Sequence, residues 1–273
     1  MPELPEVETV RRDLSPLYLG KTLGRISVTG PRTVRRHEAG RLAVLEGQAL
    51  SGIGRHGKFL LFSWTDGAVM VAHLRMSGQL LAAAAGTPLV PHTHAVLEFQ
   101  VAPELRFVDP RTFGELFIAT PRPGQVPAEL AHLGPDALVT DARHLGSAFR
   151  GRKAAVKALL VDQRVLAGVG NIYADEICFT ARVRPDRPAG SLRPREVGRL
   201  AEATRDVLAA AIAARGSTLG DQRYRDLHGE VGRYQLEHRA YGRAGMPCVT
   251  CGRPITRFRI GAKSAFACTR CQR

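Results

Sequence analysis

The chain has 273 residues, of which 44% are hydrophobic, enough to build two domains with separate cores. Its 39 Lys and Arg outnumber its 25 Asp and Glu, and the net charge of +14 favours a polyanionic partner such as nucleic acid. No apolar run approaches the roughly 18 residues that span a bilayer, and the charged N-terminal region does not resemble a signal peptide. The sequence therefore predicts a protein of the reducing cytoplasm without a membrane partner.

The chain begins with MPELPEVETV, in which Pro2 follows the initiator methionine. Removal of Met1 would leave Pro2 with a free secondary amine, whose pKa near about 8 supplies neutral nucleophile at physiological pH. Attack of this amine on a carbonyl-like carbon gives a cationic iminium, which is an electron sink. Glu3 places a carboxyl group beside the amine, where it can carry protons. Taken alone, these residues also suit an ordinary chain start.

Residues 3–19 are predicted to form a helix, because apolar side chains recur at helical spacing and Gly20 follows as a stop signal. From residue 22 to 119 the pattern changes to short β-type runs separated by Gly, Pro and Asp, which predicts an antiparallel sandwich or barrel. Within this region, residues 80–94 (LLAAAAGTPLVPHTH) are expected to form a loop.

Prolines and glycines gather between Pro121 and Gly134 and mark a domain boundary. Beyond it, helices are predicted at residues 141–150, 153–163, 172–181 and 194–215. This order, β-rich first and helical second, indicates an α+β multidomain protein rather than a parallel α/β sheet.

A glycine-spaced turn, formed by Gly168 and Gly170, precedes Asn171 at the start of the third of these helices. The free N–H groups of a helix N-terminus and the Asn side chain can bind a phosphate there. The alternative is an ordinary glycine turn between paired helices. A dinucleotide site is not expected, because no strand precedes the turn.

Four of the five cysteines form two CxxC pairs near the end of the chain, Cys248, Cys251, Cys268 and Cys271. This spacing predicts one structural Zn²⁺ held by four thiolates, and a redox CxxC motif is the alternative. Cys178 is predicted to be a buried structural residue.

The predicted hairpin between the cysteine pairs is purely basic. From Ala240 to the end there are seven Arg and Lys and no Asp or Glu, and the hairpin itself carries Arg253, Arg257, Arg259 and Lys263. Such a hairpin suits contact with backbone phosphates better than base reading. A zinc ribbon used for protein contacts is the alternative.

Separated blocks of the chain, namely MPELPEVETVRR, HLRMSGQL, DPRTFGEL, GVGNIYADE and the CxxC pairs, together resemble the bacterial formamidopyrimidine-DNA glycosylases, also called 8-oxoguanine DNA glycosylase/AP lyases. The blocks span nearly the whole chain. The resemblance implies an N-terminal antiparallel β-sandwich with flanking helices (1–134), a helix–two-turn–helix DNA-binding domain (135–242) and a C-terminal zinc-finger hairpin (243–273).

The same resemblance implies a bifunctional enzyme of base-excision repair. It would remove oxidised purines from double-stranded DNA and cut the strand by β- and δ-elimination, as a monomer associated with the bacterial nucleoid. Catalysis would need no small-molecule cofactor, and zinc would be structural.

Residue by residue, Pro2 matches the family's nucleophile and Glu3 its acid/base residue. Lys58 matches a lysine that contacts phosphates beside the lesion, although by itself it suits an exposed strand edge. Positions that match DNA contacts are His73 and Asn171 for phosphates, His92 and Lys153 for further contacts, and Lys157 for handling the damaged base. Alone, each of these would pass for an ordinary surface, rim or core residue.

Met76, Arg111 and Phe113 match the trio that enters the duplex after the damaged nucleotide swings out. Extruding a base costs a few kcal/mol and leaves a hole in the stack, which Met and Phe can fill while Arg bonds the orphaned base. Without the resemblance, Met76 and Phe113 would be assigned to the core.

The chain departs from the family pattern at three places. Lys263 stands where the family has an arginine tied to phosphate binding and δ-elimination, and lysine keeps the charge without the bidentate fork. Thr112 replaces a second arginine after Arg111. Residues 218–231 fall where the family has a lesion-covering loop, but they match it poorly.

Two other functions stay open from the sequence. One is the related endonuclease VIII type, which prefers oxidised pyrimidines, although the PELPEVET start and the DPRTFG context favour the purine enzymes. The other is a non-catalytic, zinc-containing DNA-binding protein, which a retained Met1 would indicate because it blocks the amine.

Overall fold

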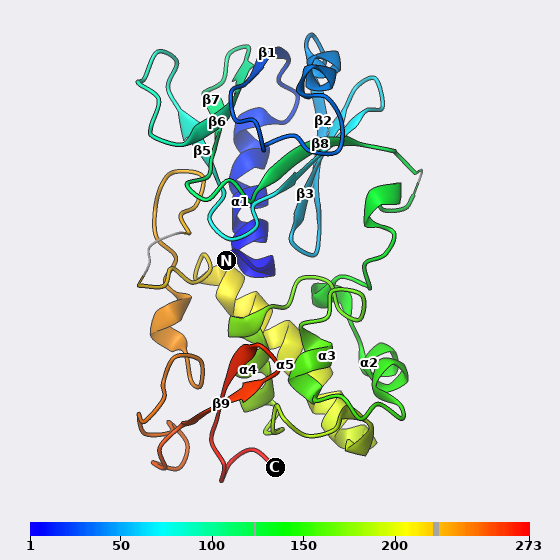
Figure 1. The fold of residues 1–273 in the computed structure, drawn as a ribbon, viewed down its shortest axis with the longest axis vertical. Coiled ribbons are helices and arrows are strands. Elements are labelled where there is room, and N and C mark those ends of the chain that lie inside the picture. The colour runs from blue at the N-terminus through cyan, green and yellow to red at the C-terminus, as the bar shows by residue number, and fades with distance from the viewer. Residues whose placement is uncertain (123, 221–223) are drawn as a thin grey trace. The chain divides into compact units, whose positions relative to one another are not determined.

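A computed structural model describes residues 1–122, 124–220 and 224–273, and they form two compact units (Figure 1). Unit 1 contains Met1–His132 together with Arg215–Arg233. Unit 2 contains Leu133–Ala214 together with Tyr234–Arg273. The segment Arg215–Arg233 therefore belongs to the unit that carries the N-terminus.

Unit 1 begins with α1 (Leu4–Tyr18), which confirms the predicted helix. Glu3 is its N-cap residue, and Pro5 lies in the first turn, where proline removes no helical hydrogen bond. The apolar stripe of the helix is fully buried, with Leu4, Val7, Val10, Leu14 and Tyr18 each at most 1% exposed. Because this stripe packs on the sheets, the N-terminal end of α1 has a fixed place in unit 1.

Two four-stranded antiparallel sheets form the rest of the core of unit 1. One sheet has the order β1 (Leu23–Val28), β6 (Thr93–Phe99), β7 (Glu104–Val108) and β5 (Gln79–Ala83). The other has the order β2 (Leu50–His56), β3 (Phe59–Trp64), β4 (Val69–His73) and β8 (Glu115–Ala119). Both sheets bury side chains in one hydrophobic cluster with α1, as predicted for a sandwich.

One prediction in this region was wrong. Residues 80–83 belong to β5 rather than to a loop, because they pair with β7 from Leu80↔Phe107 to Ala83↔Glu104. Alanine has a low strand propensity, and the cross-strand pairing outweighs it here. The loop predicted at 80–94 is therefore shorter and ends where β6 begins.

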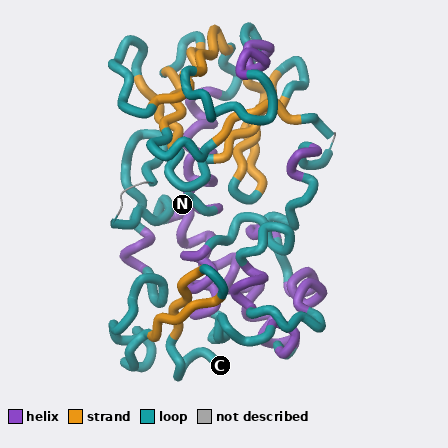
Figure 2. The backbone as a smooth tube through the Cα atoms, viewed as in Figure 1, coloured by secondary structure: helices purple, strands orange, loops and turns teal. Residues whose placement is uncertain are grey.

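Unit 2 is mainly helical, as Figure 2 shows. Its helices are α2 (Ala142–Phe149), α3 (Val156–Leu160), α4 (Asn171–Thr180) and α5 (Pro194–Ala213). A two-stranded antiparallel hairpin, β9 (Thr256–Ile260) and β10 (Lys263–Ala267), lies between the cysteine pairs. Short 3-10 helices of the two units cover Ala39–Leu45, Ala128–Leu130, Ala137–Val139, Ala189–Ser191 and Tyr234–Glu237.

The second predicted helix of unit 2 is shorter than expected. At its start, the N–H groups of Val156 and Lys157 donate to carbonyls of the 185–187 loop rather than within a longer helix. At its end, the Asp162 side chain accepts the N–H of Arg164 at 3.0 Å and turns the chain. Among the described residues no helix is both long and apolar enough to span a membrane.

Candidate active site and zinc centre

The N-terminal residues are held by the start of α1. The Pro2 and Glu3 residues are buried, and Glu3 is 2% exposed. The Glu3 N–H donates to Glu6 Oε2 at 2.8 Å, and the Glu3 carboxylate accepts the Glu6 N–H, which completes a capping box. Pro2 therefore directly precedes a rigid helix cap.

Glu6 connects this cap to the segment Arg215–Arg233. Its second oxygen, Oε1, accepts the N–H of Ser217 at 2.7 Å, and the Glu6 side chain is 1% exposed. Gly216 makes this approach possible: its φ is +79°, and a Cβ there would lie 2.8 Å from Glu6 Oε1. Sequence reasoning missed Glu6, although a Glu at the third helical position is the signal for a capping box.

An ion cluster fastens the same segment to α1. Arg215 Nη2 lies 2.5 Å from Asp13 Oδ2 and 2.5 Å from Asp226 Oδ2. The Tyr224 hydroxyl donates to the Arg215 carbonyl at 3.1 Å. The predicted covering segment 218–231 thus has anchored ends within unit 1, while residues 221–223 lie outside the described part of the chain.

Lys58 lies on the β2–β3 turn and is 6% exposed, so it is not the freely exposed strand-edge lysine that its local sequence allows. The turn is tied to α1: Arg55 donates to the Gly57 carbonyl at 2.9 Å, and its Nε lies 3.0 Å from Glu8 Oε2. The helix that begins beside Pro2 therefore also positions the Lys58 turn.

Glu8 is the centre of this connection. Its carboxylate bonds Arg11, Arg12 and Arg55 at 2.8 to 3.0 Å and is 8% exposed. Burial by itself would raise the pKa of Glu8, but the hydrogen bonds from the three guanidinium groups outweigh it and lower the pKa to about 2. Glu8 therefore stays charged at neutral pH.

His73 is the last residue of β4 and is 7% exposed, so most of its side chain is buried. Its Nδ1 accepts the N–H of Arg75 at 3.1 Å, which leaves the proton on Nε2. Burial, followed by the charge of Arg75, lowers its pKa to about 3. The ring is therefore neutral at pH 7 and can offer one Nε2–H donor.

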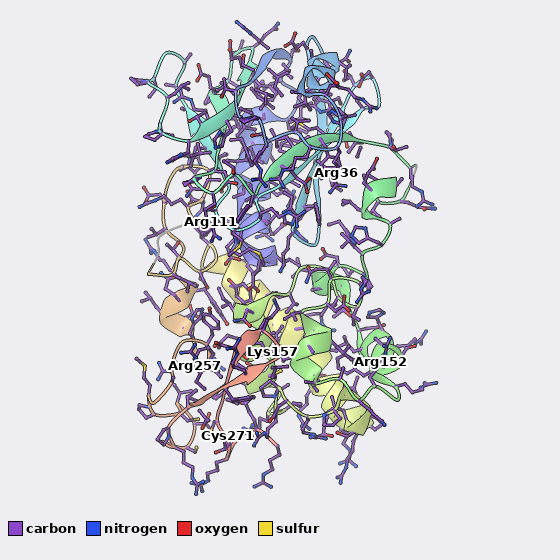
Figure 3. The ribbon with its side chains drawn as sticks, in the orientation of Figure 1. Arg36, Arg111, Arg152, Lys157, Arg257 and Cys271 are labelled. Carbon is purple, nitrogen blue, oxygen red and sulfur yellow. The ribbon has the colours of Figure 1, made fainter. Side chains whose placement is uncertain are left out.

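The predicted inserting residues do not belong to the core. Met76 and Phe113 are 39% and 37% exposed. Arg111, labelled in Figure 3, holds its guanidinium carbon 4.8 Å from the centre of the Phe113 ring. The core assignment that each residue would receive by itself was wrong.

Asp109, which sequence reasoning missed, holds the two loops that present these residues. It is fully buried, and it accepts bonds from Ser77 Oγ at 2.6 Å, Arg111 N–H at 3.1 Å and Gly114 N–H at 2.6 Å. One carboxylate therefore fixes both the Met76 loop and the Arg111–Phe113 loop. The only local sign of this role in the sequence is that Asp109 precedes a proline, a pair typical of turns.

His92 is exposed in the loop before β6, with a φ of +65°. In unit 2, Lys153 is exposed before α3, and Asn171 is the first residue of α4. The glycine turn before Asn171 is braced by Gln163, whose side chain accepts the Gly168 N–H at 3.0 Å and donates to the Val169 carbonyl at 2.8 Å. The structure thus places Lys153 and Asn171 on unit 2 and His92 on unit 1.

Lys157 is only 1% exposed, which differs from the solvated helical lysine expected from the local sequence. Its Nζ lies 2.8 Å from Asp175 Oδ2 and donates to the Ser264 carbonyl at 2.7 Å. Both of these partners belong to unit 2. The ammonium group is therefore engaged within the protein.

The four cysteines of the CxxC pairs form one cluster with all Sγ atoms within 4.8 Å of one another. The Sγ atoms of Cys248 and Cys271 are 3.9 Å apart, and those of Cys251 and Cys268 are 3.5 Å apart. A tetrahedral Zn²⁺ with Zn–S bonds of about 2.3 Å requires sulfurs about 3.8 Å apart, so this set fits one ion. Cys178, by contrast, is buried in α4, as predicted.

The hairpin closed by this cluster presents its cations outward. Arg257, Arg259 and Lys263 are exposed, and Lys263 stands at the start of β10 after the turn at Gly261, whose φ is +57°. A hairpin too small for its own hydrophobic core is stabilised by the metal and leaves its surface free for a polyanion.

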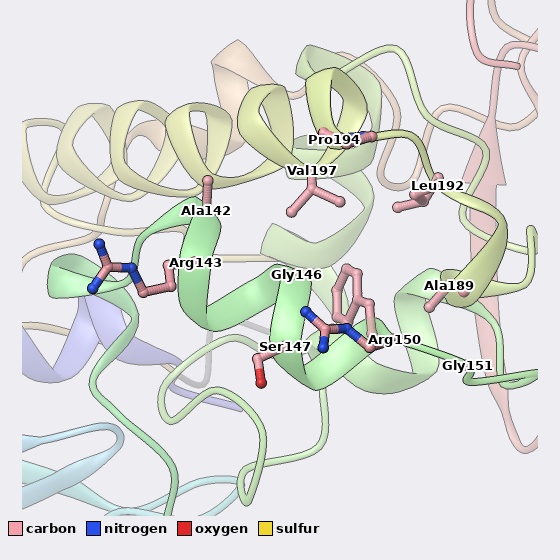
Figure 4. A pocket seen from close by; sticks show the side chains of 12 residues that line it. Ala142, Arg143, Gly146, Ser147, Arg150, Gly151, Ala189, Leu192, Pro194 and Val197 are labelled. Atoms are coloured by element: carbon pink, nitrogen blue, oxygen red, sulfur yellow. The ribbon is translucent and has the colours of Figure 1, made fainter.

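A hollow of about 510 Å³ opens in unit 2 between α2 and the start of α5 (Figure 4). Its wall is apolar at Phe149, Leu192 and Val197, and Arg143 and Arg150 lie beside it. None of the residues predicted to contact DNA lines it. The hollow is therefore not the site that the sequence predicts.

Comparisons with known proteins agree along the whole chain. Residues 1–116 match the formamidopyrimidine-DNA glycosylase N-terminal domain, residues 133–223 the H2TH domain of the same glycosylase, and residues 245–273 a zinc finger found in FPG and IleRS. This zinc-finger match, together with the cysteine cluster, assigns one structural zinc ion to the chain.

Relatives and solved structures give the same result. Formamidopyrimidine-DNA glycosylase from Thermus thermophilus is 45% identical over 100% of this chain and 98% of its own, and that from Moorella thermoacetica is 42% identical over 95% of each. The crystal structure of the MutM (Fpg) protein from Thermus thermophilus matches with a TM-score of 0.87 and 43% identity over 99% of this chain and 98% of its own. A Lactococcus lactis Fpg structure, a complex with DNA containing N7-benzyl-Fapy-dG, has the same TM-score, 30% identity and full coverage of both chains. The chain belongs to the formamidopyrimidine-DNA glycosylase family.

Proposed function

We propose that this chain removes oxidised purines from duplex DNA and then cuts the strand at the abasic site, with Pro2 as the nucleophile. The observation that carries the proposal is the placement of Pro2 directly before the capped N-terminus of α1, beside buried Glu3. Its family membership supports a DNA glycosylase and AP lyase of base-excision repair. Damaged duplex DNA, the ligand in the L. lactis complex, is the corresponding partner.

The chemistry starts when Met1 is removed and the Pro2 amine attacks C1′ of the damaged nucleotide. The glycosidic C–N bond breaks, the base leaves with a proton, and Glu3 protonates the ring oxygen as the sugar opens. The resulting iminium withdraws electrons, so loss of the C2′ proton breaks the C3′–O bond in β-elimination. Loss of a second proton, from C4′, breaks the C5′–O bond in δ-elimination, and hydrolysis of the iminium then frees Pro2.

The remaining candidate residues bind and shape the DNA. Lys58 and the neutral Nε2–H of His73 contact phosphates from unit 1, and the Asn171 side chain contacts one from unit 2. Met76, Arg111 and Phe113 fill the gap left by the extruded base. His92 and Lys153 add further DNA contacts. Lys263 binds a phosphate as a point charge and assists the δ step.

The domain assignment proposed for this activity is the catalytic sandwich 1–134, the helix–two-turn–helix domain 135–242 and the zinc finger 243–273. Repair of chromosomal DNA fits a monomer in the bacterial cytoplasm, associated with the nucleoid. The net charge of +14 supports that association through counterion release.

The proposal is tested by comparing excision of 8-oxoguanine opposite C with excision of thymine glycol opposite A. Faster cleavage of the 8-oxoguanine duplex, with product ends that carry phosphates on both sides of a one-nucleotide gap, is expected. Preference for thymine glycol would make the chain an oxidised-pyrimidine enzyme. Mass spectrometry of the purified protein provides the control, because a retained Met1 would block the amine.

A further inference from the structure

Lys157 and Asp175 form a fully buried ion pair that the proposed chemistry does not use. Lys157 comes from α3 and Asp175 from α4, their side chains are 1% and 0% exposed, and Nζ lies 2.8 Å from Oδ2. Burying two charges is costly, and removing one member of such a pair leaves an uncompensated buried charge. Both charged groups are closed off from solvent, so the pair is not placed to bind a ligand from solvent.

The same ammonium group reaches the zinc hairpin. Lys157 Nζ donates to the carbonyl oxygen of Ser264 at 2.7 Å, and Ser264 directly follows Lys263 in β10. Figure 3 labels Lys157 where α3 and the hairpin meet. A charge-assisted hydrogen bond is stronger than a neutral one. Because it holds the backbone of Ser264, it also restrains the position of the neighbouring Lys263.

A hollow beside this turn leaves room for the turn to move, so the bond from Lys157 can determine where the turn lies. A hollow of about 240 Å³ lies between α3 and the turn, lined by Lys157, Ala158, Val161, Ile260, Ala262 and Lys263. A turn beside such a space can shift without a steric clash. The bond from Lys157 opposes that shift.

α4 supports both the zinc module and the segment that leads into it. Glu176, next to Asp175, accepts the N–H groups of Arg239, Ala240 and Tyr241 at 2.8 to 2.9 Å. Phe179 of α4 packs in one cluster with Phe266 of the hairpin and two of the cysteines. Because α4 begins at Asn171, one helix carries a candidate phosphate contact and the support of the hairpin.

We propose that Lys157 is a positioning residue that does not touch DNA: paired with Asp175, it holds the Ser264 carbonyl so that Lys263 and Asn171 keep a fixed spacing toward the phosphates. This inference rests on the proposed function, because it takes Lys263 to be a DNA contact. The resemblance to the family implies that Lys157 handles the damaged base directly, and the positioning role is proposed in place of that role.

A double-mutant cycle between Lys157→Met and Lys263→Ala tests the proposal, with kcat/KM for δ-elimination on an abasic duplex as the readout. If Lys157 acts through the turn, Lys157→Met lowers kcat/KM about tenfold in the wild-type background and less than about twofold once Lys263 is absent. Equal losses in both backgrounds, or no loss in either, would overturn it. Lys21→Met is the matched control for removing one lysine.

The double variant Lys157→Met/Asp175→Leu distinguishes a loss of stability from a loss of positioning. This double variant leaves no unpaired buried charge, and its Tm and zinc content should approach those of the wild type. Its kcat/KM should stay as low as that of Lys157→Met, because the bond to Ser264 is still missing. Recovery of kcat/KM together with Tm would mean that Lys157 serves stability alone.

Hydrogen exchange gives a readout that does not depend on activity. The peptide covering residues 258–267 should exchange faster in Lys157→Met and Lys157→Met/Asp175→Leu than in the wild type, and Lys263→Ala should leave it unchanged outside its own position. Unchanged exchange in both Lys157 variants would contradict the inference. Wild-type protein that fails to cleave DNA would instead refute the proposed function and leave the exchange result to decide the inference.

Discussion

At the scale of single residues, Glu6 uses both oxygens of one buried carboxylate to join segments 211 residues apart. One oxygen holds the Glu3 N–H at the helix cap, and the other holds Ser217. The cap and the start of Arg215–Arg233 therefore have fixed positions relative to Pro2 within unit 1. Local sequence predicts the first bond, but only the fold brings Ser217 to the second.

Lys58 is the residue whose charge is most directly testable. If Lys58 contacts a phosphate, Lys58→Ala should reduce the slope of log Kd for DNA against log salt concentration by about 1, the value for one phosphate contact. Titrations of an abasic duplex at several salt concentrations measure this slope. Lys21→Ala is the control with an equal loss of charge, and an unchanged slope for Lys58→Ala would remove Lys58 from the site.

At the scale of elements, Asp109 makes a single unit of the Met76 loop and the Arg111–Phe113 loop. Asp109→Asn puts an amide N–H₂ against one of its N–H or O–H partners, and each buried partner left unsatisfied costs about 1–3 kcal/mol. Because these loops are needed when a stacked base must be extruded, kcat/KM should fall more on an 8-oxoguanine duplex than on an abasic duplex.

Asp66→Asn, at an exposed turn where Asp66 accepts the Ala68 N–H, is the matched control for the Asp109 variant. It should leave both rates unchanged. An equal fall on both substrates for Asp109→Asn would show that the loops do not serve base extrusion.

Helix α1 and the β2–β3 hairpin are joined by the Glu8 cluster, whose stability depends on pH. The folded pKa of Glu8, about 2, lies below its ordinary value of 4.5. The stabilisation is therefore complete above about pH 4.5 and is lost as the pH falls toward 2, with a total of about 3 kcal/mol. Buried His73 adds acid sensitivity from pH 6.5 downward, because only the unfolded chain takes up its proton.

Urea unfolding at pH 5 and pH 3 measures this difference. Glu8→Gln should be less stable than the wild type at pH 5 and should lose less free energy of unfolding on the way to pH 3. The His73 contribution is common to both proteins and cancels in the comparison. Equal losses would mean that Glu8 is not the titrating group.

At the scale of the whole molecule, the zinc finger should be required for DNA binding but not for the fold of unit 1. Chelation of zinc removes the tetrahedral closure of β9–β10, and with it the fixed arrangement of the exposed cations on the hairpin. Affinity for an abasic duplex should fall about tenfold or more and return on addition of Zn²⁺. Full affinity in protein shown by metal analysis to be zinc-free would contradict this.

Much of the architecture could be predicted because its signals are local. The apolar stripe of α1, the short β runs and the CxxC spacing are each contained in a short stretch of chain. The supports of the site could not be predicted in this way. Lys157 meets Ser264 across 107 residues, and Asp109 meets Ser77 across 32, so their partners follow only from the packed fold.

The role of Pro2 as the nucleophile is tested most directly by trapping. The protein is incubated with an 8-oxoguanine duplex and borohydride, which reduces the iminium to a stable amine, and the adduct is mapped by tryptic digestion. One covalent DNA adduct is expected, on the peptide that begins at Pro2 and ends at Arg11. No adduct, an adduct on a lysine, or one that Pro2→Gly leaves unchanged would contradict this role.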